Sequence, residues 1–127
     1  MLLTRDEASA AVDLPTERVP VPELKPGGEL LVQGLSGRDR DKFEADSMGG
    51  KGRSREVNLR NIRARLLVRC LINEDKSLMF ADRDQDLVGR WRGDVVDRIF
   101  SVAQRLSGMS QEDIEALGEA STTQEAG

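Results

Sequence analysis

The chain has 127 residues, a length that favours one small domain with a single modest core. Its formal net charge of −4 disfavours general affinity for nucleic acid. Aromatic residues make up only 3%, so the core must consist mainly of Leu, Val and Ile. The absence of histidine removes the commonest general base and metal ligand. A single cysteine, Cys70, excludes an internal disulfide and a thiolate zinc site.

The distribution of apolar residues predicts a soluble protein. No apolar run approaches the roughly 18 residues that a membrane helix requires. The N-terminus passes from Met1–Leu3 directly to polar residues, without the apolar core of a signal peptide. Cys70 lies among leucines, so we expect a small buried thiol, which fits a reducing compartment. We therefore expect a cytoplasmic protein without a membrane partner.

The first third of the chain predicts a short helix and a β-hairpin. Thr4–Glu7 has the capping-box pattern, and the helix that it starts should end before Pro15. Glu17–Leu24 favours an edge strand, because two alternate prolines remove backbone donors along one side. Lys25–Gly28 is a strong turn signal, and Glu29–Leu35 then returns as the second strand.

Two helices follow, separated by a basic loop. Ser36 is the predicted cap of a helix that runs to about Ser47, and Gly49–Ser54 is a flexible loop. Asn58 can cap a central helix over Leu59 to about Ile72. Arg63 falls inside the apolar stripe of this helix, so it must pair, extend to solvent or face a partner. We expect an intramolecular carboxylate partner for it, because buried charges are usually paired.

The remaining residues predict mainly helix. We expect a turn over Asn73–Ser77 and then a short apolar segment over Leu78–Phe80. Three helices follow, over Asp82–Trp91, Asp94–Ser107 and Ser110–Leu117, and a tail occupies residues 119–127. The whole pattern predicts an α+β, mainly helical fold, with an N-terminal β-hairpin followed by a small bundle of about four to five helices. It also predicts one domain over residues 1–118 and a disordered polar tail over 119–127.

No pattern in the chain predicts catalysis or a cofactor. Asp82, Asp84 and Asp86 superficially resemble a calcium loop, but the glycine and the terminal glutamate of that loop are not at the required offsets. The glycine-rich segments do not match a phosphate loop. We therefore expect no catalytic residue, no metal ligand and no cofactor.

Basic residues concentrate in one segment. Residues 51–69 contain seven Lys or Arg and one Glu, a net charge of +6 in a chain that is acidic overall. The arginines at 60, 63, 65 and 69 spread around the central helix, and no aromatic residue lies among them to stack on bases. We expect them to neutralise the acidic remainder of the domain, with nucleic-acid binding as the weaker alternative.

An ordered series of segments over residues 1–118 resembles the tail assembly chaperones of long-tailed bacteriophages and related prophages. The segments that carry the resemblance are Met1–Glu7, Asp13–Glu17, Val19–Glu23, Val32–Gly37, Asp41–Glu44, Val57–Leu66 and Asp97–Ser110. The resemblance implies a non-catalytic protein of the host cytoplasm that acts during tail building and is absent from the mature virion. It implies binding to the tape measure protein and to the major tail-tube protein, with a homo-oligomer as a possible assembly.

Two other functions stay open beside that resemblance. The first is a structural tail or connector component of the virion, and the second is a small nucleic-acid-binding regulator.

The family often makes a longer product by ribosomal frameshifting near the end of the short reading frame. The resemblance implies that the polar tail over 119–127 is where such an extension would begin.

The predicted partner-binding residues lie in two places. Leu87, Val88 and Trp91 form an apolar cluster interrupted by glycine, and the only tryptophan can serve as a core anchor or as an interface anchor. Four basic residues of the loop and central helix complete the set: Lys51, Arg53, Arg55 and Arg63.

Overall fold

The computed structural model describes residues 1–10, 13–48 and 61–117. The chain is α+β and mainly helical, as the sequence predicts. Among the described residues, no helix combines the length and the apolar content that crossing a membrane requires. The predicted tail over 119–127 lies outside the described residues.

The three strands of the structure form one antiparallel sheet. Its strands are β1 (Thr16–Pro20), β2 (Glu29–Gln33) and β3 (Leu71–Ile72), in the order β1-β2-β3. Val19 pairs with Leu30. The edge position of β1 confirms the prediction, since Pro20 cannot donate to a second neighbouring strand, whereas Pro22 lies in the turn after the strand.

Strand β1 is shorter than the sequence predicts. It ends at Pro20 instead of Leu24, because the chain turns after Val21. The amide of Val21 donates to the carbonyl of Gly28 (2.9 Å), and the amide of Leu24 donates back to Val21 (3.0 Å). Gly27 takes a φ of 75°, which closes the turn at low cost because glycine has no Cβ.

Helix α2 (Gly37–Met48) begins where the cap predicts. The hydroxyl of Ser36 accepts a hydrogen bond from the Asp39 amide at 3.2 Å. Phe43 on this helix is fully buried and anchors it to the core. The predicted helix end at about Ser47 agrees to one residue.

The predicted central helix is corrected at its C-terminal end. Helix α4 (Ile62–Cys70) stops before Leu71, and Leu71–Ile72 form β3 instead of a last helical turn. These two residues pair with Val32 and Leu31 of β2, and both side chains become buried. Strand pairing is therefore favoured over another helical turn, because it adds a third strand to the sheet and buries two large side chains. The predicted cap at Asn58 lies outside the described residues.

The predicted helix over Asp82–Trp91 is also corrected, because it is divided and shorter. A 3-10 turn, η1 (Asp82–Asp84), leads into α5 (Gln85–Gly89), which ends two residues early. The Asp84 carboxylate accepts a hydrogen bond from the Ala81 amide at 2.9 Å, so the cap is Ala81, one residue before the predicted Asp82. In the segment Leu78–Phe80, Leu78 forms an isolated β-bridge with Ile72, and the segment does not form a strand.

The last two helices agree with the prediction. Helix α6 (Gly93–Leu106) is the long amphipathic helix, and Gly108 follows it with a φ of 69°. A final helix over 111–117 begins with a reciprocal cap between Ser110 and Asp113. These two hydrogen bonds join the Ser110 amide to the Asp113 carboxylate (2.8 Å) and the Asp113 amide to the Ser110 hydroxyl (3.1 Å).

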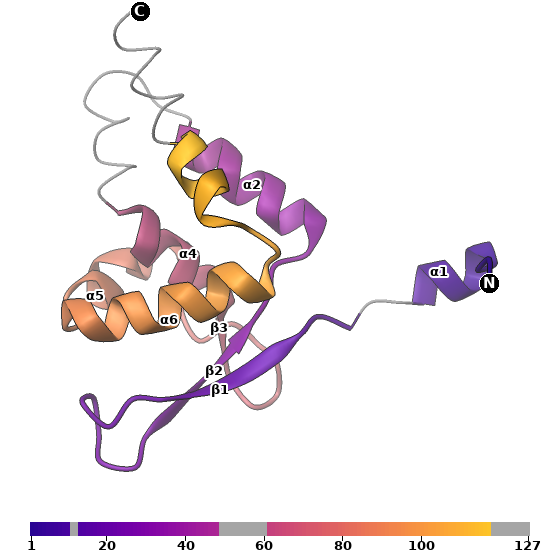
Figure 1. The fold of residues 1–127 in the computed structure, drawn as a ribbon. Coiled ribbons are helices and arrows are strands. Elements are labelled where there is room, and N and C mark those ends of the chain that lie inside the picture. The colour runs from indigo at the N-terminus through magenta and orange to yellow at the C-terminus, as the bar shows by residue number, and fades with distance from the viewer. Residues whose placement is uncertain (11–12, 49–60, 118–127) are drawn as a thin grey trace, which may run out of the picture.

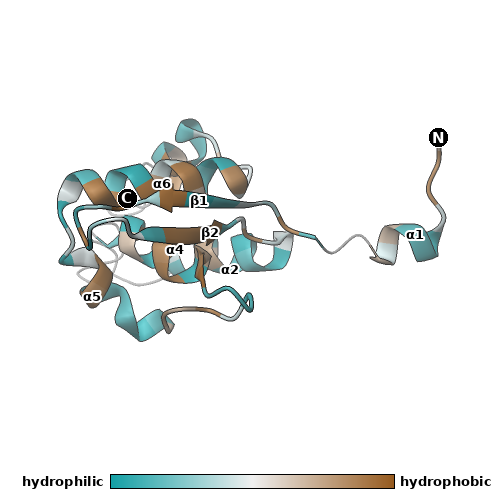
Figure 2. Cartoon of the chain, turned by 90° about the horizontal axis from the view of Figure 1, so that it is seen from below, coloured by the Kyte–Doolittle hydropathy of each residue, from teal (hydrophilic) through white to brown (hydrophobic). Residues whose placement is uncertain are grey.

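The core lies between the sheet and the helices. Helix α6 crosses β1 and β2, and α4 packs against α6 (Figure 1). The central side chains of this core are fully buried: Val32, Leu66, Leu67, Leu71, Val95 and Ile99. Helix α1 (Arg5–Ala10) buries no residue and lies apart from this body in both views (Figures 1 and 2).

Candidate partner-binding surface

The α5 cluster reaches the surface only in part. Leu87 is 51% exposed, whereas Val88 is fully buried in the core. Trp91 is half-buried, packs against the core and meets the Phe80 ring edge-on, with ring centroids 5.9 Å apart. Any contact that this cluster makes with a partner therefore falls to Leu87 and the exposed part of Trp91.

Arg63 finds the carboxylate partner that the sequence predicts. Its Nε lies 3.4 Å from Oδ1 of Asp97, and its guanidinium carbon lies 6.0 Å from the centroid of the Phe100 ring. Its side chain is 61% exposed, so the charge also keeps its hydration. Lys51, Arg53 and Arg55, the other predicted basic contacts, lie outside the described residues.

A groove of about 480 Å³ opens beside Arg63, between α4, α6 and the helix over 111–117. Its apolar part consists of Ile62, Phe100 and Ile114, one residue from each of these helices. Arg63 and Asp97 form a charged wall, and Ser101, Gln104 and Gln111 add polar lining. We call this feature the α4–α6 groove. It does not include Leu87 or Trp91, so the structure separates Arg63 from the α5 cluster.

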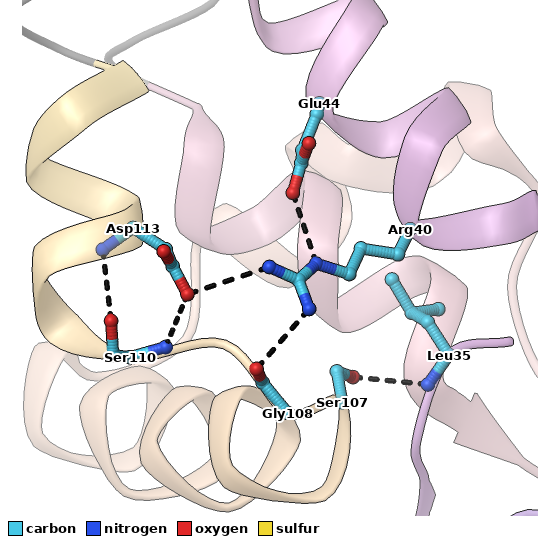
Figure 3. Close-up of polar contacts among 7 residues, drawn as sticks. All are labelled: Leu35, Arg40, Glu44, Ser107, Gly108, Ser110 and Asp113. Atoms are coloured by element: carbon cyan, nitrogen blue, oxygen red, sulfur yellow. Dashed lines mark hydrogen bonds and ion pairs between the residues drawn. The ribbon is translucent and has the colours of Figure 1, made fainter. Parts of the chain in front are cut away.

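The helix over 111–117, which forms one side of the groove, is held in place by Arg40 (Figure 3). From α2, its guanidinium donates to Glu44 (3.0 Å), to the carbonyl of Gly108 (3.2 Å) and to Asp113 (3.4 Å). One side chain thereby joins α2, the end of α6 and the helix over 111–117. The pKa of Asp113 is lowered, chiefly because the Ser110 amide donates to its carboxylate, and Arg40 adds to the effect.

Two arginines of α4 pair with acidic residues of the same chain. Besides Arg63 with Asp97, Arg69 lies between Asp46 and Asp82. The Arg69 guanidinium also lies 5.8 Å from the centroid of the Phe43 ring. These contacts agree with the expected neutralisation for Arg63 and Arg69, whereas Lys51, Arg53, Arg55 and Arg60 lie outside the described residues.

No group of three or more Asp, Glu or Cys residues within the described ranges could hold a metal ion. Cys70 is fully buried, as predicted, and burial raises the pKa of its thiol to about 12. The thiol is therefore protonated at neutral pH and is not an accessible nucleophile.

Sequence reasoning identified Arg63 but missed the apolar side of the groove. Ile62 and Phe100 belong to helix stripes that point to a core, and Ile114 lies on a predicted short helix. The spacing of Ile114 and Leu117 marks an apolar side on that helix, and Leu117 is buried. No local pattern shows that these helices meet, because their contact depends on the turn at Gly108 and on Arg40.

Comparison with known proteins places the chain in a family. The family model described as phage tail assembly chaperone matches residues 11–117. Among solved structures, the chain is similar to the tail assembly chaperone of bacteriophage HK97, with a TM-score of 0.55 and 20% sequence identity. That match covers 81% of this chain and 98% of the other, and it shows a shared fold. No curated protein matches the chain. Because the family model covers nearly all of the folded body, the chain belongs to the phage tail assembly chaperone family.

Proposed function

We propose that this chain binds the tape measure protein and promotes assembly of the tail tube around it, without catalysis. Membership of the tail assembly chaperone family supports this proposal. The proposed partners are the tape measure protein and the major tail-tube protein. The proposed place of action is the host cytoplasm, with the chain absent from the mature virion.

The observation that carries the proposal is the α4–α6 groove. Its apolar lining, Ile62, Phe100 and Ile114, lies beside the charged pair of Arg63 and Asp97. A helix with a narrow apolar stripe fits such a surface, because a few apolar side chains can contact Ile62 and Ile114 while its polar residues meet the polar and charged lining. A long helical partner would offer this face many times, so weak single contacts would add up to a stable complex.

Binding of the tape measure protein tests the groove directly. The Ile114→Ser variant should weaken binding, with a loss of about tenfold if one apolar side chain leaves the interface. Leu24→Ser, which changes an exposed leucine on the hairpin turn, is the matched control and should bind normally. Circular dichroism would establish that both variants are folded. Normal binding by Ile114→Ser would exclude the groove as the binding site.

The α5 cluster is tested separately, because it does not line the groove. Trp91→Ala and Leu87→Ser should each weaken binding if this surface also contacts the tape measure protein. Unfolding of Trp91→Ala, together with normal binding by Leu87→Ser, would assign Trp91 to the core alone.

Mass spectrometry of purified particles addresses the structural alternative: a tail component would be present in virions, whereas the proposed chaperone would not.

A further inference from the structure

The two ends of the α4–α6 groove differ in their chemistry. Four of the lining residues share one face of α6, with the spacing i, i+3, i+4 and i+7: Asp97, Phe100, Ser101 and Gln104. Two helical turns, about 10 Å, separate Asp97 from Gln104. Arg63 lies beside Asp97, whereas Gln111 lies with Gln104, since both also line the hollow beyond the groove. The groove is therefore charged at one end and uncharged at the other.

The uncharged end opens into that neighbouring hollow, which has a volume of about 460 Å³. Three residues line both features: Ser101, Gln104 and Gln111. None of their side chains makes a hydrogen bond within the described part of the chain, so two amides and one hydroxyl are available to a partner. A helix that lies along α6 passes over these polar groups after it leaves the apolar part of the groove.

At the charged end, Arg63 keeps most of its hydrogen-bonding capacity unused. Its Nε lies 3.4 Å from Oδ1 of Asp97, and its guanidinium donates no hydrogen bond within the described residues. The guanidinium carbon lies 6.0 Å from the ring centroid of the buried Phe100, which places the charge over the apolar lining. The Nη1 and Nη2 atoms can therefore donate two parallel hydrogen bonds to a carboxylate.

An acidic side chain is the partner group that this end favours. Asp97 also offers a charge, but protein interfaces are enriched in arginine and depleted in aspartate. The planar guanidinium binds a carboxylate in a fixed orientation and is only weakly hydrated. The sequence before α4 adds to this preference, because residues 51–60 contain four Lys or Arg and one Glu. These features favour a negative charge on the partner at the end of the groove that holds Arg63.

We propose that Arg63 is a specificity-determining residue of the groove. It selects a partner helix with an acidic side chain at one end of its apolar stripe and uncharged polar side chains about seven residues away, two helical turns along. The carboxylate pairs with Arg63, and the apolar stripe contacts Ile62 and Ile114. The uncharged side chains meet Gln104 and Gln111, so the unequal ends set the direction of the helix along α6. This inference rests on the proposed function, because it names the class of tape-measure segment that the groove binds.

Binding of the tape measure protein to the full chain at low and high salt tests the role of Arg63. Arg63→Gln should weaken binding about three- to fivefold at low salt, because an exposed ion pair contributes modestly to affinity. The difference should shrink at high salt, which screens the pair in the wild-type complex. Arg18→Gln is the matched control, since Arg18 is 67% exposed, pairs with the single carboxylate of Glu29 and does not line the groove. This control should bind as the wild-type chain does at both salt concentrations.

A compensating change of charge identifies the acidic residue on the partner. Arg63→Glu should bind more weakly than Arg63→Gln, because it places like charges together. Each acidic residue of the bound tape-measure segment is then changed to Lys, and one such change should restore binding to Arg63→Glu while weakening binding to the wild-type chain. Circular dichroism would establish that both Arg63 variants are folded.

The failure of this inference is distinguishable from the failure of the proposed site. Normal binding by Arg63→Gln, together with weakened binding by Ile114→Ser, would overturn the selection by charge and leave the groove as the binding site. The absence of any restoring Lys change would overturn it in the same way. Normal binding by Ile114→Ser would instead exclude the groove itself, and the inference with it.

Discussion

At the scale of single residues, Gly34 shows how closely α6 approaches the sheet. A Cβ added at this position would lie 2.2 Å from the carbonyl oxygen of Leu106, far inside van der Waals contact. The neighbouring atoms belong to the backbone, so a rotamer change cannot relieve the clash. Next to it, the amide of Leu35 donates to the buried hydroxyl of Ser107 at 3.0 Å (Figure 3). The end of β2 and the end of α6 are therefore held at one fixed separation.

The first prediction is that Gly34→Ala lowers the free energy of unfolding by about 1–3 kcal/mol or more, because overpacking must push α6 away from β2. Gly37→Ala is the matched control, since an added Cβ at that first position of α2 meets nothing within 4 Å. The control should be neutral or slightly stabilising, because alanine favours helix over glycine. Denaturant titration of the two variants measures the difference, and equal stabilities would contradict the close approach.

At the scale of elements, one ion pair fastens the hairpin turn to α6. The Nη1 and Nη2 atoms of Arg98 donate to the two carboxylate oxygens of Glu23, the first at 2.9 Å, and Nη1 also donates to the carbonyl of Pro20. These hydrogen bonds lower the pKa of Glu23 from 4.5 to about 2. A bidentate pair of this kind fixes orientation as well as distance.

The second prediction concerns stability at low pH. Because the pKa of Glu23 is lowered in the folded chain, the pair stabilises the fold above pH 4.5, and this stabilisation disappears as pH falls from 4.5 towards about 2. Glu23→Gln should therefore be less stable than the wild-type chain at neutral pH and should lose less stability on acidification. Thermal unfolding measured across this pH range tests it. Parallel pH profiles for the two proteins would show that the pair contributes nothing.

The third prediction concerns the wall of the groove that Arg40 supports. Arg40→Met removes the hydrogen bonds to Gly108 and Asp113 but keeps much of the apolar side chain. Hydrogen exchange should then accelerate over 111–117 while α4 stays protected, because local opening follows the loss of local contacts. Binding of the tape measure protein should weaken in the same variant. Unchanged exchange over 111–117 would mean that packing of Leu117 alone holds this helix.

At the scale of the whole molecule, the α4–α6 groove and the α5 cluster are separate surfaces. The fourth prediction follows from this separation: if both surfaces contact the tape measure protein, Ile114→Ser and Leu87→Ser should weaken binding additively, because changes at separate sites act independently. Isothermal titration of the two single variants and the double variant makes the comparison. A double variant that binds no more weakly than Ile114→Ser would exclude the α5 cluster from the interface.

Much of the local structure could be read from the residues before the fold was known. The caps at Thr4, Ser36 and Ser110, the edge strand with its prolines and the helix before Gly108 follow from short-range rules of hydrogen bonding and backbone geometry. The sequence-based predictions were wrong where contacts between residues far apart in the sequence determine the local structure. Leu71 and Ile72 leave the helix for β2, and the α5 region stops at Gly89.

By itself, the sequence determined the α+β class, the positions of most helices and the lack of histidine and cysteine chemistry, because these depend on composition and on neighbours along the chain. Only the tertiary structure decided that Arg63 meets Asp97, that Ile62, Phe100 and Ile114 share one groove, and that α1 buries no residue. Such contacts join residues far apart in sequence, and their geometry depends on how the whole core packs. No local pattern of residue types records that geometry.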